Sequence, residues 1–264
     1  MQHEAAIRLT VFIGLFAVLA LAEHLLPRRG LRARKPQRWM TNWALVLIDT
    51  ATLRLLAFAV PALAVGAAID ATARGYGLFN QLDWPLWLEF IAALLILDFL
   101  IWAQHLITHK VPVLWRLHRV HHADTDMDVT TAIRFHPVEI ALSMLLKIGA
   151  VYLFGPAAVA VIVFEVILNG CAMFNHSNLR LPPRVDAVLR LFLVTPDMHR
   201  VHHSDKRSEH DSNYGFSISL WDRLFRTYIA QPKDSHDTMT IGLKWQDERP
   251  TRLGWSLKLP FVRR

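Results

Sequence analysis

Three apolar runs, each long enough to cross a lipid bilayer as a helix, constrain this chain more than any other feature. A helical crossing needs about 20 residues, and the runs extend approximately over Ala5–Leu26, Trp43–Ile69 and Pro85–Ile107. The first run lacks the short apolar core and small-residue cleavage site of a signal peptide, so we expect it to remain as a span. Pro61 is expected to kink the second helix. The sequence therefore predicts an all-α integral membrane protein.

The charges predict how these helices are oriented. Hydrophobic residues make up 53% of the 264 residues, yet the net charge is +7. The segment Arg28–Arg38 holds six basic residues and no acidic one, whereas the loop Asp70–Trp84 is nearly neutral. Because basic loops stay in the cytoplasm, we expect Arg28–Arg38 there and the N-terminus outside. Basic charge on such a chain favours contact with anionic lipid, and without a nucleic-acid signature we expect no nucleic-acid partner.

A fourth apolar stretch, residues 138–168, is interrupted by Gly155-Pro156, and each half is shorter than one comfortable span. We interpret it as a helical hairpin that enters the membrane and returns on the same side. The chain then divides into residues 1–107, with about three transmembrane helices and the basic loop, and residues 108–264. The second region would be catalytic and would contain the hairpin and a histidine-rich helical cap in the cytosol.

Clustered histidines carry the chemistry. Eight of the fourteen histidines form three boxes, one with spacing i, i+4 and two with the repeated sequence His-Arg-Val-His-His: His105 and His109; His118, His121 and His122; His199, His202 and His203. Residues three and four apart share a helix face, and imidazole suits iron, zinc and copper. The boxes thus predict about four ligands for each of two metal ions, with positions left open for oxygen or water.

Two further histidines flank the hairpin, where the chain re-emerges beside the boxes. On this position His136 and His176 are also candidate metal ligands, whereas His3, His24, His210 and His236 are expected to be bystanders. The single cysteine, Cys171, excludes an intrachain disulfide and a cysteine-based zinc or iron–sulfur centre.

Carboxylates are expected beside the imidazoles, because a site of neutral ligands around two divalent ions carries excess positive charge. Asp98 and Asp197 are the main candidates to orient imidazole N–H groups, with Asp124 and Asp205 as further ones. A solvated surface carboxylate is the alternative for all of them except Asp98, which lies inside an apolar helix.

The histidine boxes and their surroundings resemble the fatty acid hydroxylase/sterol desaturase superfamily over about residues 90 to 230. The resemblance rests on Asp98-x6-His105-x3-His109, Leu114–His122, Arg134–Glu139, His199–His203, Asn213–Phe216 and Trp221–Tyr228. It implies a helical membrane enzyme with a di-metal site on the cytosolic side. Such an enzyme oxidises fatty acyl, sterol or related lipids with dioxygen.

The chain departs from the family pattern at four positions. Arg226 stands where glycine is usual, which we interpret as a harmless surface change, and Leu106 and Trp102 replace a frequent arginine and tyrosine. Some members have an extra histidine where this chain has Ala172. That loss leaves the ligand number of the second ion open, and His136 is the candidate to compensate.

The expected activity is hydroxylation or desaturation of a lipid C–H bond by two iron ions and O2, with zinc as a possible substitute metal. The lipid class stays open among sterol, hopanoid, carotenoid and fatty acyl. No complete Gly-x-Gly-x-x-Gly motif and no cysteine set is present, so the electrons are expected from a separate ferredoxin- or cytochrome-type donor with its reductase. The basic C-terminal region, from Asn169 onward, is expected to dock that donor or to contact lipid headgroups.

Two other classes of protein share some of these features. A metal transporter places its ligands near the bilayer midplane, whereas these histidines lie at predicted helix ends. A non-catalytic zinc-stabilised scaffold needs no open coordination position. A bacterial inner membrane is the expected location, with the endoplasmic reticulum as the alternative.

Overall fold

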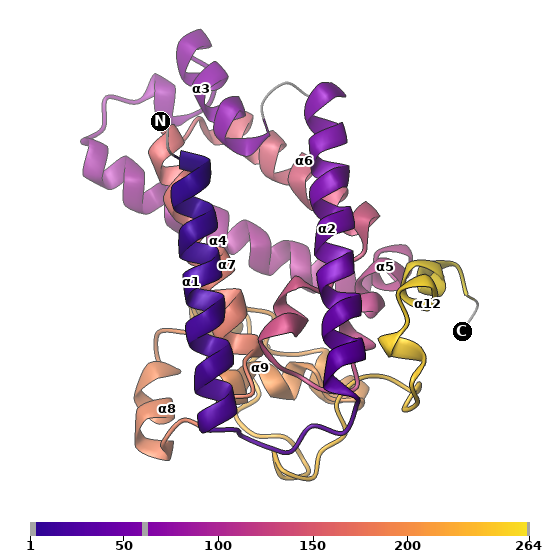
Figure 1. Ribbon diagram of the computed structural model, residues 1–264. Helices are drawn as coiled ribbons and strands as arrows, with labels where there is room; N and C mark the ends of the chain where they lie inside the picture. Colours follow the sequence, from indigo (N-terminus) through magenta and orange to yellow (C-terminus); the bar gives the residue numbers. More distant parts are fainter. Residues whose placement is uncertain (1–3, 60–62, 263–264) are drawn as a thin grey trace.

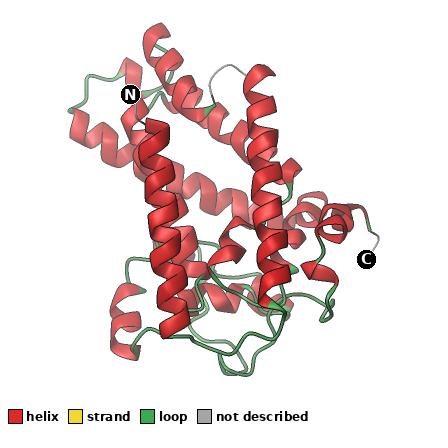
Figure 2. Ribbon diagram, viewed as in Figure 1, coloured by secondary structure: helices red, strands yellow, loops and turns green. Residues whose placement is uncertain are grey.

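The structure, a computed structural model, describes residues 4–59 and 63–262, and this part of the chain is helical with a few isolated β-bridges (Figure 2). The longer helices are α1 (Glu4–Leu25), α2 (Lys35–Ala59), α3 (Ala64–Arg74), α4 (Leu86–Lys110), α5 (Pro112–His122), α6 (Pro137–Phe154) and α7 (Ala158–His176). Short helices follow: α8 (Pro183–Leu189), α9 (Pro196–His202), α10 (Arg207–His210), α11 (Leu220–Leu224) and α12 (Leu253–Lys258). The 3-10 turns are η1 (Phe79–Gln81), η2 (Val129–Ile133), η3 (Arg249–Thr251) and η4 (Leu259–Phe261).

Within the described residues, four helices are long and apolar enough to cross a membrane: α1 over Ala6–Leu25, and the whole of α4, α6 and α7. Only 17% to 33% of each span is buried inside the protein, so most of its apolar side chains face outward, as a bilayer requires. The expected all-helical fold with membrane-crossing helices is thereby confirmed, but the second predicted span, Trp43–Ile69, is not among these four helices. The second predicted span is divided, because α2 ends at Ala59 and α3 begins at Ala64. The expected kink at Pro61 lies outside the described residues.

The predicted hairpin is present as α6 and α7, and each arm, of 18 and 19 residues, is itself long enough to span. The expectation that the two halves are too short to cross is therefore corrected. Gly155 turns the chain between them in a left-handed conformation, with φ of +65°. A Cβ atom on Gly77 would lie 2.3 Å from the backbone nitrogen of Gly155, so the loop before α4 packs backbone to backbone on this turn.

The short helices gather at one end of the bundle. Figure 1 shows α8 near the lower end of α1, with the loops of the C-terminal region below α2, and α9 packs against α7. The basic loop between α1 and α2 lies at the same end. Its backbone pairs with the chain after α7, where the Arg28 N–H donates to the carbonyl oxygen of Asn178 at 2.8 Å.

A buried ion cluster joins α2 to the segment after α5. Arg38 is fully buried and donates to Asp124 Oδ1 at 2.6 Å and to Asp128 Oδ2 at 2.8 Å. Burial alone would raise the pKa of Asp128, but the charge and hydrogen bonds of Arg38, with those of Thr130 and Trp39, hold it at about 2. Arg38 was expected in the basic loop between the first two spans; it belongs instead to α2, and its side chain is buried.

Candidate metal centre

Nine histidines from four helices converge in the interior, in two groups whose nitrogens lie within 4.8 Å of one another. The first group has five members and the second has four: His105, His109, His118, His122 and His202; His121, His176, His199 and His203. All nine are buried. The structure thus brings together nine of the ten histidines selected from the sequence.

Each His-x-x-His-His box contributes to both groups. In α5, His118 and His122 belong to the first group and His121 to the second. Around α9 the arrangement is reversed, because His202 joins the first group while His199 and His203 join the second. Residues four apart lie almost above one another on a helix, whereas the third is turned to one side. One box can therefore supply two neighbouring ions.

Hydrogen bonds determine which ring nitrogen is available in the first group. His105 Nδ1 donates to the Tyr214 carbonyl oxygen at 2.7 Å, and His118 Nδ1 donates to Glu139 Oε1 at 2.6 Å. A neutral imidazole carries one proton, so Nε2 of both rings presents a lone pair. These two Nε2 atoms lie 3.0 Å apart. With no proton between them, the two lone pairs repel each other. A metal cation bound by both nitrogens would remove this repulsion.

In the second group, too, Nδ1 atoms are engaged in hydrogen bonds and Nε2 atoms face one another. Nδ1 of His176 donates to the Ala172 carbonyl oxygen at 2.7 Å, and Nδ1 of His121 donates to the Arg134 carbonyl oxygen at 3.2 Å. Their Nε2 atoms lie 3.1 Å apart, and His199 Nε2 is also 3.1 Å from that of His176. Nitrogens about 2.1 Å from one ion and at right angles would be about 3 Å apart.

Several ring nitrogens are buried without any hydrogen-bond partner. Both nitrogens of His109, His122 and His203 are in this state, as is Nε2 of His202. A buried polar atom without a partner costs about 1–3 kcal/mol, and metal coordination would remove that cost. The residues present therefore fit two transition-metal ions.

The pKa values of the histidines in the cap also suit metal binding. Burial, with the neighbouring imidazoles adding to it, lowers the pKa well below 6.5 for His121, His122, His199, His202 and His203. These rings are therefore neutral near pH 7, and a metal ligand must be neutral imidazole.

The tenth candidate, His136, lies outside both groups. It caps the start of α6, where Nδ1 accepts from the Val138 N–H and Nε2 donates to the Leu257 carbonyl oxygen at 3.3 Å. It therefore does not compensate for Ala172, and the second group keeps four members. The expected bystanders His24, His210 and His236 are also outside both groups, and His3 lies outside the described residues.

The carboxylates proposed to orient imidazoles have other partners. Asp98 Oδ2 accepts from Trp221 Nε1 at 2.8 Å. Asp98 lies about two helical turns before His105 on α4. Asp197 pairs with Arg28, with Arg200 and with His236, which is in neither group.

The other two carboxylate candidates have no such role either. Asp124 pairs with Arg38 in the interior, and Asp205 is exposed.

Two other carboxylates lie beside imidazoles of the first group: Glu139 accepts from His118, and Asp211 Oδ1 lies 3.6 Å from Nδ1 of His109. The sequence pattern contains Glu139, but its role was missed because only the fold brings α6 to α5.

A loop anchored by Asp222 supports two of the histidines. This buried carboxylate accepts from the backbone N–H groups of Tyr214 and Gly215 and from Trp102 Nε1. The same loop offers the Tyr214 carbonyl to His105 and the Ser212 carbonyl to His202, the latter at 2.6 Å. Asp222 therefore acts through the backbone on the orientation of both rings.

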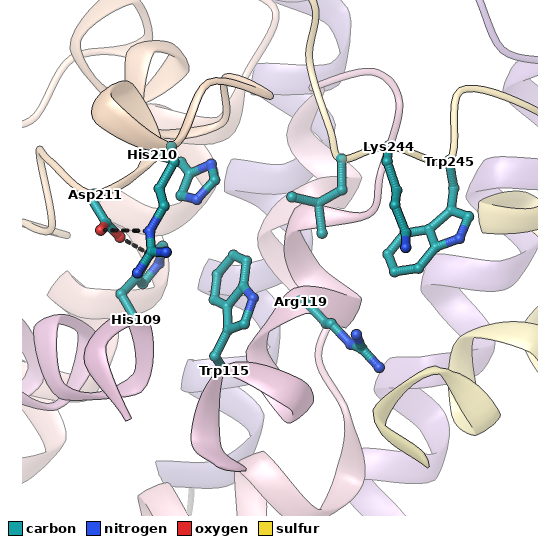
Figure 3. A pocket seen from close by; sticks show the side chains of 9 residues that line it. His109, Trp115, Arg119, His210, Asp211, Lys244 and Trp245 are labelled. Atoms are coloured by element: carbon teal, nitrogen blue, oxygen red, sulfur yellow. Dashed lines mark ion pairs between the residues drawn. The ribbon is translucent and has the colours of Figure 1, made fainter. Parts of the chain in front are cut away.

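Two cavities reach the first group from different sides. One, of about 280 Å³, lies among the four candidate membrane spans and α2 and is lined by His105 and His118. The other, of about 260 Å³, lies in the cap and is lined by His109 and Trp115. Figure 3 shows this second cavity, with the ion pairs of Asp211 at its edge. The buried histidine cluster is thus bordered by one cavity among the long helices and by one in the cap.

The fold and the site define a multi-pass helical membrane protein with a buried polyhistidine centre. Comparison with known proteins identifies it further, because the profile described as fatty acid hydroxylase matches residues 90–227. The chain belongs to this family of lipid-oxidising oxidoreductases.

The curated relatives are hydroxylases and monooxygenases. Ornithine lipid hydroxylase OlsE of Rhizobium tropici is 25% identical over 235 residues, which cover 88% of this chain and 70% of that protein. Alkylglycerol monooxygenase of Homo sapiens is 31% identical over 158 residues, or 60% of this chain and 34% of the relative. Fatty acid hydroxylase vlmA of Lecanicillium sp is 30% identical over 181 residues, which cover 61% of this chain and 47% of that protein. The chain thus spans about a third to a half of the last two proteins. The comparison with solved structures found no significant match.

Proposed function

We propose that this protein hydroxylates a C–H bond of a membrane lipid, using two iron ions held by the nine histidines, dioxygen and electrons from a separate protein. The convergence of nine buried imidazoles beside a cavity among the membrane helices carries the proposal. The names of the relatives, which are lipid hydroxylases and monooxygenases, support the same chemistry.

The protein's own residues would bind, orient and shield the reactants. When bound, the two ions would supply the oxygen-activating redox chemistry. Glu139 and the loop carbonyls hold their imidazoles with Nδ1 outward and Nε2 inward, which fixes the ligand set before any metal arrives. The cavity between the helices would place one C–H bond beside His105 and His118 and keep bulk water away.

The metal centre is proposed to face the cytoplasm of a bacterial inner membrane. The basic loop between α1 and α2 lies on the same end of the bundle as the histidines. Arg28 pairs with Asp197, and Arg29 donates to the carbonyl of Met239 at 2.8 Å. The positive-inside tendency therefore applies to the metal centre as well. The electron donor, of ferredoxin or cytochrome type, would then approach the cap from the cytoplasm.

The test is metal analysis and product analysis on the purified protein. Full-length protein in lipid nanodiscs should contain about two iron ions per chain and should consume dioxygen when a lipid extract, a ferredoxin and its reductase are supplied. Mass spectrometry should find a lipid heavier by one oxygen atom. A lipid lighter by two hydrogens would instead indicate desaturation.

The rival functions give different results. A transporter would show metal flux in vesicles without lipid oxidation, and a scaffold would show bound metal and neither activity. The exposed residue His24 provides a control, because a His24→Ala protein should match the parent. Retained oxidation in both His121→Ala and His202→Ala would overturn the site.

A further inference from the structure

The cavity among the long helices is lined by polar and charged side chains as well as by apolar ones. Its lining includes Gln104, Ser143 and Asn169 between the histidine end and a charged end, where Arg8, Lys147 and Glu165 lie. Apolar residues such as Ile101, Met144 and Leu168 complete the walls. A cavity for a bare hydrocarbon chain would need none of these polar groups, since each costs free energy to bury in an apolar space.

Helix α6 sets the length of this space. Glu139, Ser143 and Lys147 follow one another at intervals of four residues and line the same cavity, so they share one helix face. With a rise of 1.5 Å per residue, Lys147 lies about 12 Å along the axis from Glu139. Glu139 binds His118. The charged end therefore lies about two helical turns along α6 from the residue that holds His118.

Three charged side chains from three helices meet at the far end. Glu165 Oε1 accepts from Lys147 Nζ at 2.7 Å, and Glu165 Oε2 accepts from Arg8 at 2.5 Å. Lys147 and Glu165 are largely shielded, with side chains 11% and 7% exposed. Charged groups inside a membrane protein are costly and usually mark a functional site. The alternative is a structural role, because the three residues also tie α1, α6 and α7 together.

Two observations favour a ligand. A lysine ammonium has three donors, and Glu165 takes one of those of Lys147. At the other end of the cavity, the buried Oε2 of Glu139 has no hydrogen-bond partner. Both groups could be satisfied by one elongated molecule with an acceptor at its charged end and a hydroxyl or N–H near the metal centre.

We infer that this cavity holds the headgroup end of the lipid substrate, with an anionic group, phosphate or carboxylate, bound by Lys147 and Arg8. Gln104, Ser143 and Asn169 would bind polar linkages of the lipid, and the oxidised carbon would lie at the end of the cavity lined by His105 and His118. This inference deepens the proposed function and rests on it. Among the lipid classes left open by the sequence, it favours polar acyl lipids over sterols, hopanoids and carotenoids.

Lipid binding tests the inference without turnover. The full-length protein in nanodiscs would be titrated with dimyristoyl phosphatidic acid, N-myristoylglycine, dimyristoylglycerol and squalene, and bound lipid would be measured by native mass spectrometry. At least one anionic lipid should bind ten-fold or more tightly than dimyristoylglycerol and squalene. Which of the two binds separates phosphate from carboxylate as the recognised group. Equal binding of all four lipids would overturn the inference.

Variants separate recognition from structure. The double variant Arg8→Met/Lys147→Met, which removes both proposed partners of the anion, should lose the ten-fold preference, whereas Lys147→Arg should retain it. Arg54→Met removes an exposed cation of α2 outside the cavity and should leave the preference unchanged. A double variant that melts at a lower temperature but keeps the full preference would show a structural role only and would overturn the assignment.

Two further readouts complete the test. If the double variant does not fold, Asn169→Leu should still weaken anionic-lipid binding at least three-fold, and an unchanged affinity would count against the cavity. Because binding is measured without turnover, loss of the proposed oxidation alone would leave the lipid preference intact.

Discussion

His118 donates a hydrogen bond from Nδ1 to Glu139 Oε1 at 2.6 Å, while its Nε2 faces that of His105 at 3.0 Å. The contact joins the second histidine box to the first turn of α6. One side chain thus connects the candidate metal centre with the wall of the membrane cavity.

Replacing Glu139 should weaken the first metal position. Glu139→Leu removes the acceptor that holds His118, and loss of such a partner typically lowers metal affinity 10- to 100-fold. Glu139→Gln keeps an acceptor oxygen, so its metal affinity should fall less than that of Glu139→Leu. Dialysis against graded chelator, followed by metal analysis, measures both. Equal metal retention in the parent and in Glu139→Leu would contradict the prediction.

Single histidine variants should remove one ion at a time. His203→Ala leaves three imidazoles in the second group and His122→Ala leaves four in the first, so each should bind about one ion fewer under mild chelation. His136→Ala should retain the full number, because both nitrogens of His136 bond to backbone groups. Loss of metal in His136→Ala would show that the ligand set is incorrect.

Removing the Asp222 carboxylate should destabilise the protein and its metal centre together. Asp222→Ala leaves the buried N–H groups of Tyr214 and Gly215 without an acceptor, which should cost about 3 kcal/mol or more. The melting temperature in detergent and the bound metal report the two effects. Asp234→Ala breaks an exposed pair with Lys206 and should change neither measurably.

The Asp128 carboxylate should make stability depend on acid pH. Its pKa is about 2 in the folded protein against 3.8 for the free group, a difference of about 2 kcal/mol. The folded pKa is depressed, so this stabilisation is complete above about pH 4 and is lost as the pH falls from 4 to 2. Asp128→Asn should therefore lower the melting temperature at pH 7 and lower it less at pH 3. An equal fall in melting temperature at pH 7 and pH 3 would argue against the ion pair between Asp128 and Arg38.

Arg226 should carry backbone strain. The sequence interpretation treats it as a harmless replacement of the usual glycine, but its φ is +59°, in the left-handed region. That conformation costs a side-chain-bearing residue about 1 kcal/mol or more. Arg226→Gly should therefore raise the melting temperature by a few degrees. A lower value would show that contacts of the arginine outweigh the strain.

The sequence by itself determined the membrane helices and most of the candidate ligands. Long apolar runs and four-residue histidine spacing are local patterns, and a helix converts them directly into a lipid-facing surface and a shared face. The hairpin at Gly155 followed from the same local patterns. His136 and His176 were both selected for their position beside it, and only His176 joins a histidine group.

Only the tertiary structure decided how those residues are used. It divided each His-x-x-His-His box between two groups and placed His136 outside both groups. It also paired Asp98 with Trp221 and Glu139 with His118 through hydrogen bonds. The carbonyls that orient His105 and His202 come from backbone, which every residue possesses and no sequence motif marks. Such partners depend on how distant segments pack, and local periodicity carries no information about that packing.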